Sequence, residues 1–214
     1  MITGTTRLLG VIGAPIEHSL SPIIQNAALR AANLDYVYTA FPVSRCALDS
    51  AVRGLRDAGV VGFNVTIPFK TEVMRLMDEL SEDARRIQAV NTVVVQSDGR
   101  LRGCNTDAIG FCTGLEERGI DLHGKKAVLI GAGGAARAAL WGLLRSGISS
   151  VDIGVRTIEK GQMLCRDFTM DADVHAYRFD DSAFSTALSC ADIVVQTTPM
   201  GMTPDIEKMP PVDI

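Results

Sequence analysis

Three features that would indicate particular classes of protein are missing from this chain of 214 residues. Lys and Arg are not in excess, because the formal net charge is −4, so the chain lacks the basic field that binds nucleic acid or an anionic membrane surface. No uninterrupted apolar run reaches the ~18 residues of a membrane-spanning helix. The first residues also lack the charged region of a signal peptide. We therefore expect neither nucleic acid nor a membrane as a partner.

Cysteines are few, and their arrangement argues against two kinds of site. The five are Cys46, Cys104, Cys112, Cys165 and Cys190. Their odd number, their irregular spacing and the absence of a C-x-x-C pair indicate neither a disulfide framework nor a metal site. We expect reduced and mostly buried thiols, and hence a cytoplasmic location.

Patterning along the first hundred residues predicts alternating strands and helices. With 47% hydrophobic and 21% charged residues, the composition is typical of a packed globular protein. Apolar runs predict strands at 7–13, 36–43, 60–68 and 89–95, and helical patterns occur at 22–34, 47–59 and 70–87. The Asp98-Gly99 dipeptide predicts a hairpin turn after the last strand. This part of the chain is therefore predicted to be an α/β domain.

The second half has the rhythm of a doubly wound parallel sheet. Asp107 opens a helical stretch, and we place the domain boundary there, which gives domains 1–106 and 107–214. A strand, a glycine-rich turn and a helix are predicted within 125–147, then a strand at 150–157, a polar helix and a last strand within 190–202. This order predicts a Rossmann-like dinucleotide-binding domain.

The glycine-rich turn matches the dinucleotide-binding pattern G-x-G-x-x-A at Gly131, Gly133 and Ala136. Gly131 permits a tight turn with positive φ. Gly133 lets the main chain approach a pyrophosphate, and Ala136 allows close packing of the helix on the strand. The free N–H groups of the helix start then favour phosphate. A glycine-rich turn with no ligand is the alternative, and its place between strand and helix favours binding.

Residues after the next predicted strand favour NADP over NAD. An NAD site usually has an acidic residue there, which accepts a hydrogen bond from the ribose 2′-hydroxyl. This chain has Val155, Arg156 and Thr157, followed by Lys160. Arg and Lys would bind the 2′-phosphate of NADP, whereas an acid would repel it. The alternative is that these are solvated charges at a helix start.

Polar motifs follow the predicted strands of the first domain. They are HSLSP at 18–22, NVTIPFK at 64–70 and AVNT at 89–92, and NTD at 105–107 opens the second domain. Because strand ends gather at one edge of an α/β sheet, these residues could share a cleft.

Each polar residue also has a purely structural alternative. Ser21, before Pro22, has the position of a helix N-cap, whereas Ser19 has no comparable role and so favours a ligand. Asn64 and Thr66 alternate along a strand and would face the same side. The remaining alternatives are a surface lysine in a first helical turn for Lys70, a turn cap for Asn91 and an N-cap for Asp107.

Taken together, the motifs identify a family. HSLSP, NVTIPFK, AVNT, GCNTD, GAGGAAR, VRT and TTPMGM stand in the order and approximate spacing of shikimate dehydrogenases, which the chain resembles over its whole length. The resemblance implies reversible NADPH-dependent reduction of 3-dehydroshikimate to shikimate, a step of aromatic amino acid biosynthesis. It further implies a substrate-binding catalytic domain at 1–106 and an NADP-binding domain at 107–214.

The resemblance also implies residue roles. The substrate carboxylate would be bound by Ser19 and Ser21, and the ring hydroxyls by Asn64, Thr66, Asn91 and Asp107. Lys70, paired with Asp107, would be the catalytic general acid/base, a role that suits an ammonium beside a developing alkoxide. The NADP site would be formed by Gly131, Ala132, Gly133, Gly134, Ala135, Ala136, Arg156, Thr157, Lys160, Thr197, Thr198 and Met202, with Glu82 as a further residue near the cofactor.

Two departures from the family pattern affect these expectations. Val155 stands where the family has Asn, which removes one contact on the adenosine side. Members of the family also run tens of residues further, through another strand and a glutamine that contacts substrate. We expect the motif residues to be placed correctly and the 214-residue chain to turn over poorly, whether it is a fragment or a short protein.

Two other hypotheses remain at this point. One is a quinate or aminoshikimate dehydrogenase relative, possibly linked to NAD, although no acidic residue stands beside Val155 or Thr157. The other is a non-catalytic module that binds shikimate. The sequence allows a monomer or a homodimer.

Overall fold

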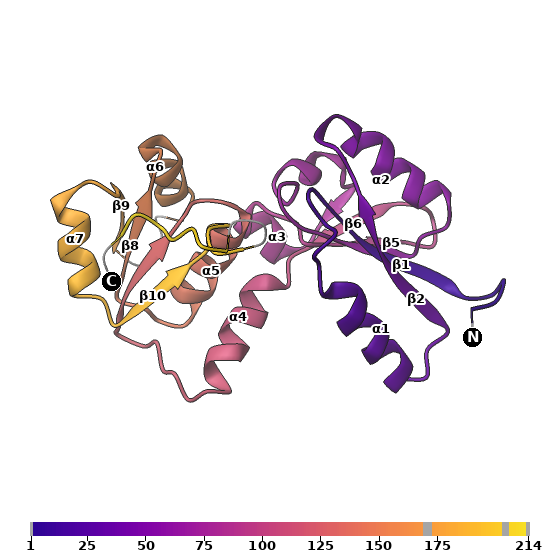
Figure 1. Ribbon diagram of the computed structural model, residues 1–214, viewed down its shortest axis with the longest axis horizontal. Helices are drawn as coiled ribbons and strands as arrows, with labels where there is room; N and C mark the ends of the chain where they lie inside the picture. Colours follow the sequence, from indigo (N-terminus) through magenta and orange to yellow (C-terminus); the bar gives the residue numbers. More distant parts are fainter. Residues whose placement is uncertain (1, 169–172, 203–205, 213–214) are drawn as a thin grey trace. The chain divides into compact units, whose positions relative to one another are not determined.

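The computed structural model describes residues 2–168, 173–202 and 206–212, and the chain divides after Thr106 into two units, Met1–Thr106 and Asp107–Ile214. Each unit has its own sheet with helices packed against it (Figure 1). The mixed α/β class predicted from the sequence is confirmed.

A six-stranded mixed sheet forms the centre of the first unit. Its strands are β1 (Arg7–Gly13), β2 (Tyr36–Pro42), β3 (Gly62–Val65), β4 (Glu79–Leu80), β5 (Thr92–Val95) and β6 (Leu101–Cys104). The order is β2-β1-β3-β5-β6-β4, with β1 parallel to β2 and β3, and β5 antiparallel to β3 and β6. Strands β3 and β5 are shorter than predicted, which leaves Thr66 and Asn91 in the loops at their ends.

Helices cover both faces of this sheet (Figure 1). They are α1 (Ser21–Ala31), η1 (Arg45–Ala47) and α2 (Leu48–Asp57). Leu29 of α1 packs against a cluster that contains Val11 of β1. Leu48 of α2 packs in a second cluster, which contains the next residue of the strand, Ile12. Since successive residues of a strand point to opposite faces, α1 and α2 lie on opposite sides of the sheet.

The stretch 70–87 is not one helix, so that prediction is wrong. It forms η2 (Glu72–Leu76), β4 and α3 (Glu82–Ile87). Glu79 and Leu80 pair with β6, and the Ser81 hydroxyl accepts a hydrogen bond from the Ala84 N–H at the start of α3. Pairing with the sheet and the cap at Ser81 outweigh the helix propensity of the stretch.

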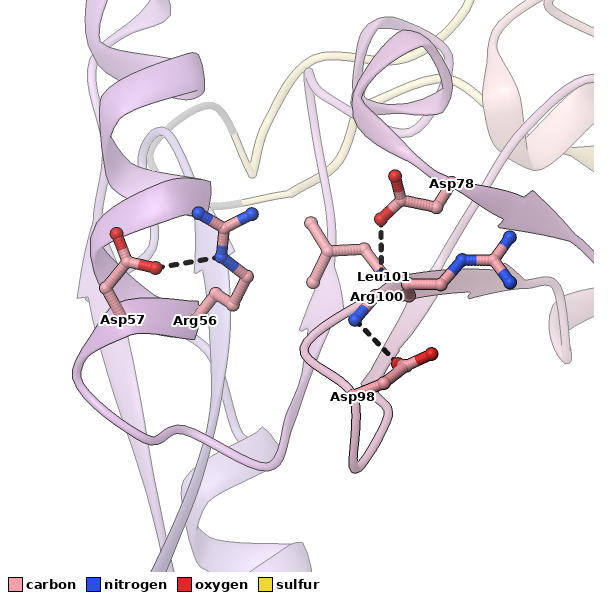
Figure 2. Close-up of polar contacts among 6 residues, drawn as sticks. All are labelled: Arg56, Asp57, Asp78, Asp98, Arg100 and Leu101. Carbon is pink, nitrogen blue, oxygen red and sulfur yellow. Dashed lines mark hydrogen bonds and ion pairs between the residues drawn. The ribbon is translucent and has the colours of Figure 1, made fainter.

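Carboxylates support the hairpin between β5 and β6, as Figure 2 shows. Asp98 accepts a hydrogen bond of 3.0 Å from the Arg100 N–H, beside Gly99 with φ of +83°. Asp78 accepts one of 2.7 Å from the Leu101 N–H, at the start of β6. The hairpin predicted from Asp98-Gly99 is confirmed, and the segment before β4 is tied to it.

The second unit is built on a four-stranded parallel sheet. Its strands are β7 (Lys126–Ile130), β8 (Ser150–Val155), β9 (Asp173–Arg178) and β10 (Ile193–Gln196), in the order β10-β7-β8-β9. Its helices are α4 (Asp107–Glu116), α5 (Gly134–Arg145), α6 (Ile158–Asp167) and α7 (Ser182–Ser189). This is half of a doubly wound sheet, in which the strand order reverses between β7 and β10.

The sequence prediction missed β9 and α7. Strand β9 reads DVHAYR, lies at the edge of the sheet and has no fully buried residue. Helix α7 is only 8 residues long and buries a single residue, Phe184. Both elements depend on packing against β8 more than on a strong local pattern.

Thiols are accessible in this fold. All five cysteines are free, but Cys46 and Cys190 are exposed and the other three are partly buried. The expectation of mostly buried thiols is therefore wrong. Among the residues described, no helix has the length and apolarity needed to cross a membrane.

Gly154 in β8 gives a stability prediction for the second unit. A Cβ there would overlap the ring of Phe184, which is 1% exposed and has little room to move. We expect Gly154→Ala to lower the free energy of unfolding by about 2–3 kcal/mol. Urea unfolding followed by the fluorescence of Trp141, the single tryptophan, measures it.

Gly114→Ala in α4 is the matched control. Nothing lies within 4 Å of its added Cβ, so this variant should be as stable as the parent or gain up to about 1 kcal/mol. Equal unfolding midpoints for the two variants would contradict the packing argument.

Candidate active site

The segment that enters α1 carries the two candidate carboxylate ligands. Helix α1 begins at Ser21, and Leu20 before it makes no side-chain capping bond. The Ser19 hydroxyl accepts a hydrogen bond of 3.3 Å from the Ser21 N–H. The expected roles are thus reversed: Ser21 is not an N-cap, and Ser19 is the serine with a local structural role. Both side chains are partly exposed and available to a ligand.

Asn64 on β3 is held by three hydrogen bonds. Its Oδ1 accepts a 2.6 Å bond from the hydroxyl of Tyr38 on β2. Its Nδ2 donates to the Asn91 carbonyl (3.2 Å) and to the Thr92 hydroxyl (3.0 Å). Both amide hydrogens are therefore in use, and one acceptor position remains on Oδ1. Asn64 can receive a hydrogen bond from a ligand hydroxyl and has none to give.

Tyr38 extends this network toward α1. The residue is 5% exposed, and burial raises the pKa of the phenol to about 12, while the nearby Ser21 side chain acts in the opposite direction. The hydroxyl stays protonated at any physiological pH, so it can donate to Asn64 throughout. Sequence reasoning missed Tyr38, because a tyrosine in a strand is usually only a packing residue.

Asn91, just before β5, is hydrogen-bonded through its side chain to Thr106, which follows β6. It is 8% exposed, and its Oδ1 accepts from the Thr106 N–H (3.0 Å) and the Thr92 hydroxyl (2.9 Å). Its Nδ2 donates to the Thr106 hydroxyl (2.9 Å). Because β5 is antiparallel to β3, this loop meets the carboxyl end of β3, where Asn64 lies. Asn91 is thus a link between loops and not a simple turn cap.

Lys70 lies in the turn that follows β3, before η2. Its carbonyl accepts a 2.7 Å bond from the Val90 N–H, which fixes the main chain next to the Asn91 loop. The preceding Phe69 is fully buried, whereas Lys70 itself is partly buried. Lys70 is therefore not in a first helical turn, contrary to the structural alternative. Thr66, also partly buried, packs its methyl group close to Gly13.

Two candidate residues are less closely tied to these segments. Asp107 is the first residue of α4 and the first of the second unit, while Lys70 belongs to the first unit. The pairing of Lys70 with Asp107 therefore stays a prediction. Glu82 is exposed in the first turn of α3, in the first unit, and its role near a cofactor also stays a prediction.

The glycine-rich turn of the second unit has the geometry that the sequence predicts. Gly131 has φ of +112°, and a Cβ on it would lie 2.8 Å from the Thr197 hydroxyl. Gly133 is exposed with nothing within 4 Å of its Cβ position, and Ala136, in the first turn of α5, is fully buried. This leaves an open approach to the first N–H groups of α5, beginning at Gly134.

The end of β10 lies beside this turn. The N–H and the hydroxyl of Thr197 both donate to the Ile130 carbonyl, at 3.0 and 2.6 Å. The Thr198 N–H donates to Oε1 of Gln196 (2.8 Å). The carboxyl ends of β7 and β10 thus meet at the point where the strand order reverses, which is where doubly wound sheets bind ligands.

The basic residues after β8 face solvent. Arg156, Thr157 and Lys160 are exposed, and Thr157 precedes α6 without a side-chain capping bond. Val155 is 3% exposed and packs toward Gly161 of α6. The Gly131 N–H donates to the Gly154 carbonyl (2.9 Å), so these residues lie along the same edge of the sheet as the glycine turn.

Arg137, the last residue of the GAGGAAR motif, is turned inward. It forms a 2.6 Å ion pair with Asp167 and lies over the ring of Phe168. With 7% of its surface exposed, it ties the first turns of α5 to the end of α6 and is not available to a ligand.

Sequence profiles of known families match both units. The profile of the shikimate dehydrogenase substrate binding domain matches residues 11–93, and that of shikimate / quinate 5-dehydrogenase matches residues 115–207. A shikimate dehydrogenase (NADP(+)) of Methanopyrus kandleri is 44% identical over 212 residues, which cover 98% of this chain and 73% of that protein.

Solved structures agree with these matches. Shikimate dehydrogenase from Aquifex aeolicus has a TM-score of 0.89 and 36% identity, with 100% of this chain and 76% of that chain covered. A shikimate dehydrogenase in complex with NADP+ has a TM-score of 0.86 and 38% identity, with 100% and 74% covered. On the profiles, the identity and the fold together, this chain belongs to the shikimate dehydrogenase family.

Proposed function

We propose that this chain catalyses the reversible NADPH-dependent reduction of 3-dehydroshikimate to shikimate. The observation that carries the proposal is the hydrogen-bonded network that joins Tyr38, Asn64 and Asn91 at the edge of the first sheet. Hydroxyl and amide groups gathered in this way would suit a polyhydroxylated ring, and the chain is a member of a family named for this reaction.

The polarity of the network supports specific substrate contacts. Ser19 and Ser21, partly exposed at the start of α1, would donate to the carboxylate. Asn64 would accept from one ring hydroxyl, since its two amide hydrogens are already used. Thr66, Asn91 and Asp107 would complete the binding of the ring hydroxyls.

Lys70 is proposed as the proton donor and acceptor at the reacting oxygen. Its ammonium would give the proton to the forming alcohol oxygen and stabilise the negative charge that develops there. The bond from the Val90 N–H to the Lys70 carbonyl fixes the main chain from which the side chain extends. Asp107 is proposed to hold the ammonium in its charged form and in position.

The second unit fits a dinucleotide phosphate. The turn from Gly131 to Ala136 would hold the pyrophosphate, because the space beside Gly133 is open, whereas a side chain on Gly131 would collide with Thr197. Thr197, Thr198 and Met202 would line the same edge, and Arg156, Thr157 and Lys160 would bind the 2′-phosphate. When bound, NADPH supplies the hydride. A cytoplasmic location is proposed on the strength of the free, partly accessible thiols.

Lys70→Ala tests the proton-transfer role. Its kcat for NADPH oxidation with 3-dehydroshikimate should fall by about 10²–10⁴-fold with a much smaller change in KM, because the lost group acts in the transition state. Lys126→Ala, an exposed lysine at the start of β7, is the control and should keep the parent kcat. An unchanged kcat in the Lys70 variant would contradict the assignment of Lys70 as the general acid/base.

Arg156→Ala tests the cofactor preference. Loss of a charge-assisted hydrogen bond to the 2′-phosphate should raise the Kd for NADPH about 10–100-fold and leave the Kd for NADH unchanged. Fluorescence titration with both cofactors measures this, with the exposed Arg118→Ala as control. Equal weakening of NADPH and NADH would contradict a 2′-phosphate contact.

Gly133→Ala tests the pyrophosphate cradle. Its Cβ meets no protein atom within 4 Å, so thermal stability should stay within about 0.5 kcal/mol of the parent. The methyl group would obstruct the phosphates, so the Kd for NADPH should rise about 10-fold or more. Gly131→Ala should lose stability as well, because its φ is +112° and Thr197 blocks the Cβ. Normal NADPH affinity in the Gly133 variant would place the cofactor elsewhere.

A further inference from the structure

Helix α1 carries Ser21 but has little apolar anchorage. None of its 11 residues is buried, and Ile23 and Ile24 are 69% and 61% exposed. Leu29 is its one side chain that packs, in part, against the cluster of Val11 and Tyr38 on the sheet. Hydrophobic burial by the residues of α1 themselves is therefore a weak means of holding the helix, and polar contacts add to it.

Asn26, one turn into this helix, makes those contacts. Its Nδ2 donates to the Pro22 carbonyl and to the Tyr38 carbonyl, both at 2.7 Å. Its Oδ1 accepts a 2.9 Å bond from the Tyr38 N–H. Because β2 is the edge strand, the Asn26 amide pairs both main-chain groups of Tyr38 as a further strand would. The side chain also holds the first turn of the helix, next to Ser21.

The three hydrogen bonds of Asn26 connect the two ends of the candidate substrate site. One side is the Pro22 carbonyl, adjacent to Ser21 in the chain. The other side is the main chain of Tyr38, whose hydroxyl donates to Asn64. The Asn26 amide is therefore a direct link between the helix that begins at the serine segment and the strand whose Tyr38 hydroxyl bonds Asn64.

We propose that Asn26 is a positioning residue, which holds the Ser19–Ser21 segment at the distance from Asn64 that a substrate with a carboxylate and ring hydroxyls requires. The inference rests on the proposed function. An amide suits this task because it presents a donor pair and an acceptor together, whereas a carboxylate lacks the donors. Asn26 acts through the Pro22 and Tyr38 main chain and not by contact with the ligand.

The test measures the Kd for shikimate and for its methyl ester by calorimetry with the full 214-residue chain, so that it does not depend on turnover. Asn26→Asp keeps the shape and the acceptor but loses both donors, and Asn26→Ala loses all three bonds. In both variants the Kd for shikimate should rise about 10-fold, as expected for one to two lost hydrogen bonds. The Kd values for the ester and for NADPH should change less than about 2-fold, because only the carboxylate contact is displaced.

Gln25→Ala, the exposed neighbour on the same helix, is the control and should bind shikimate like the parent. A parent chain that binds no shikimate would contradict the proposed function itself. Parent-like shikimate binding in both Asn26 variants would overturn the positioning role alone. The positioning role would also be overturned if the variants lost equal affinity for shikimate and for its methyl ester, or if both lost the folded circular dichroism spectrum. Either result would make Asn26 a general structural residue.

Discussion

The side-chain amide of Asn64 is the point at which three segments of the first unit meet. It accepts from Tyr38 on β2 and donates to the Asn91 and Thr92 segment at the start of β5. A polar group at the partly buried end of a strand is costly unless its hydrogen bonds are made, so each of these partners constrains the others. The network is rigid for the same reason, and what it leaves open toward a ligand is one acceptor on Oδ1.

This constraint extends outward in two directions. Through Tyr38 it reaches α1, whose Asn26 amide is hydrogen-bonded to both main-chain groups of Tyr38. Through Asn91 it reaches Thr106, the last residue of the first unit. The candidate substrate groups are therefore held by hydrogen bonds of main-chain groups and side-chain amides between loops at the edge of the sheet. Such bonds preserve distances better than flexible side chains do.

In the second unit, the glycine turn depends on the absence of side chains. A dinucleotide needs an approach to main-chain N–H groups, and this is provided by two positions without a Cβ. At Gly131 the Thr197 hydroxyl occupies the space that a side chain would take, and at Gly133 the space is open. The ion pair of the buried Arg137 with Asp167 then ties α5 to α6 behind the turn. One end of α5 is thus kept free for a ligand, while the residues behind it are fixed.

The sequence by itself determined the α/β class, the doubly wound order of the second half, the hairpin at Asp98-Gly99 and the conformation of Gly131, because each depends on local periodicity or on a φ that only glycine adopts readily. It also singled out Asn64 and Asn91 as polar residues at strand ends. Tertiary structure alone decided that 70–87 is broken into three elements, that β9 and α7 exist, and that Ser19 takes the local role expected of Ser21. It also revealed Tyr38 and Asn26, whose importance lies in partners 12 to 26 positions away in the chain. Such partners are brought close by the pairing of strands and the packing of α1, and no local pattern encodes them.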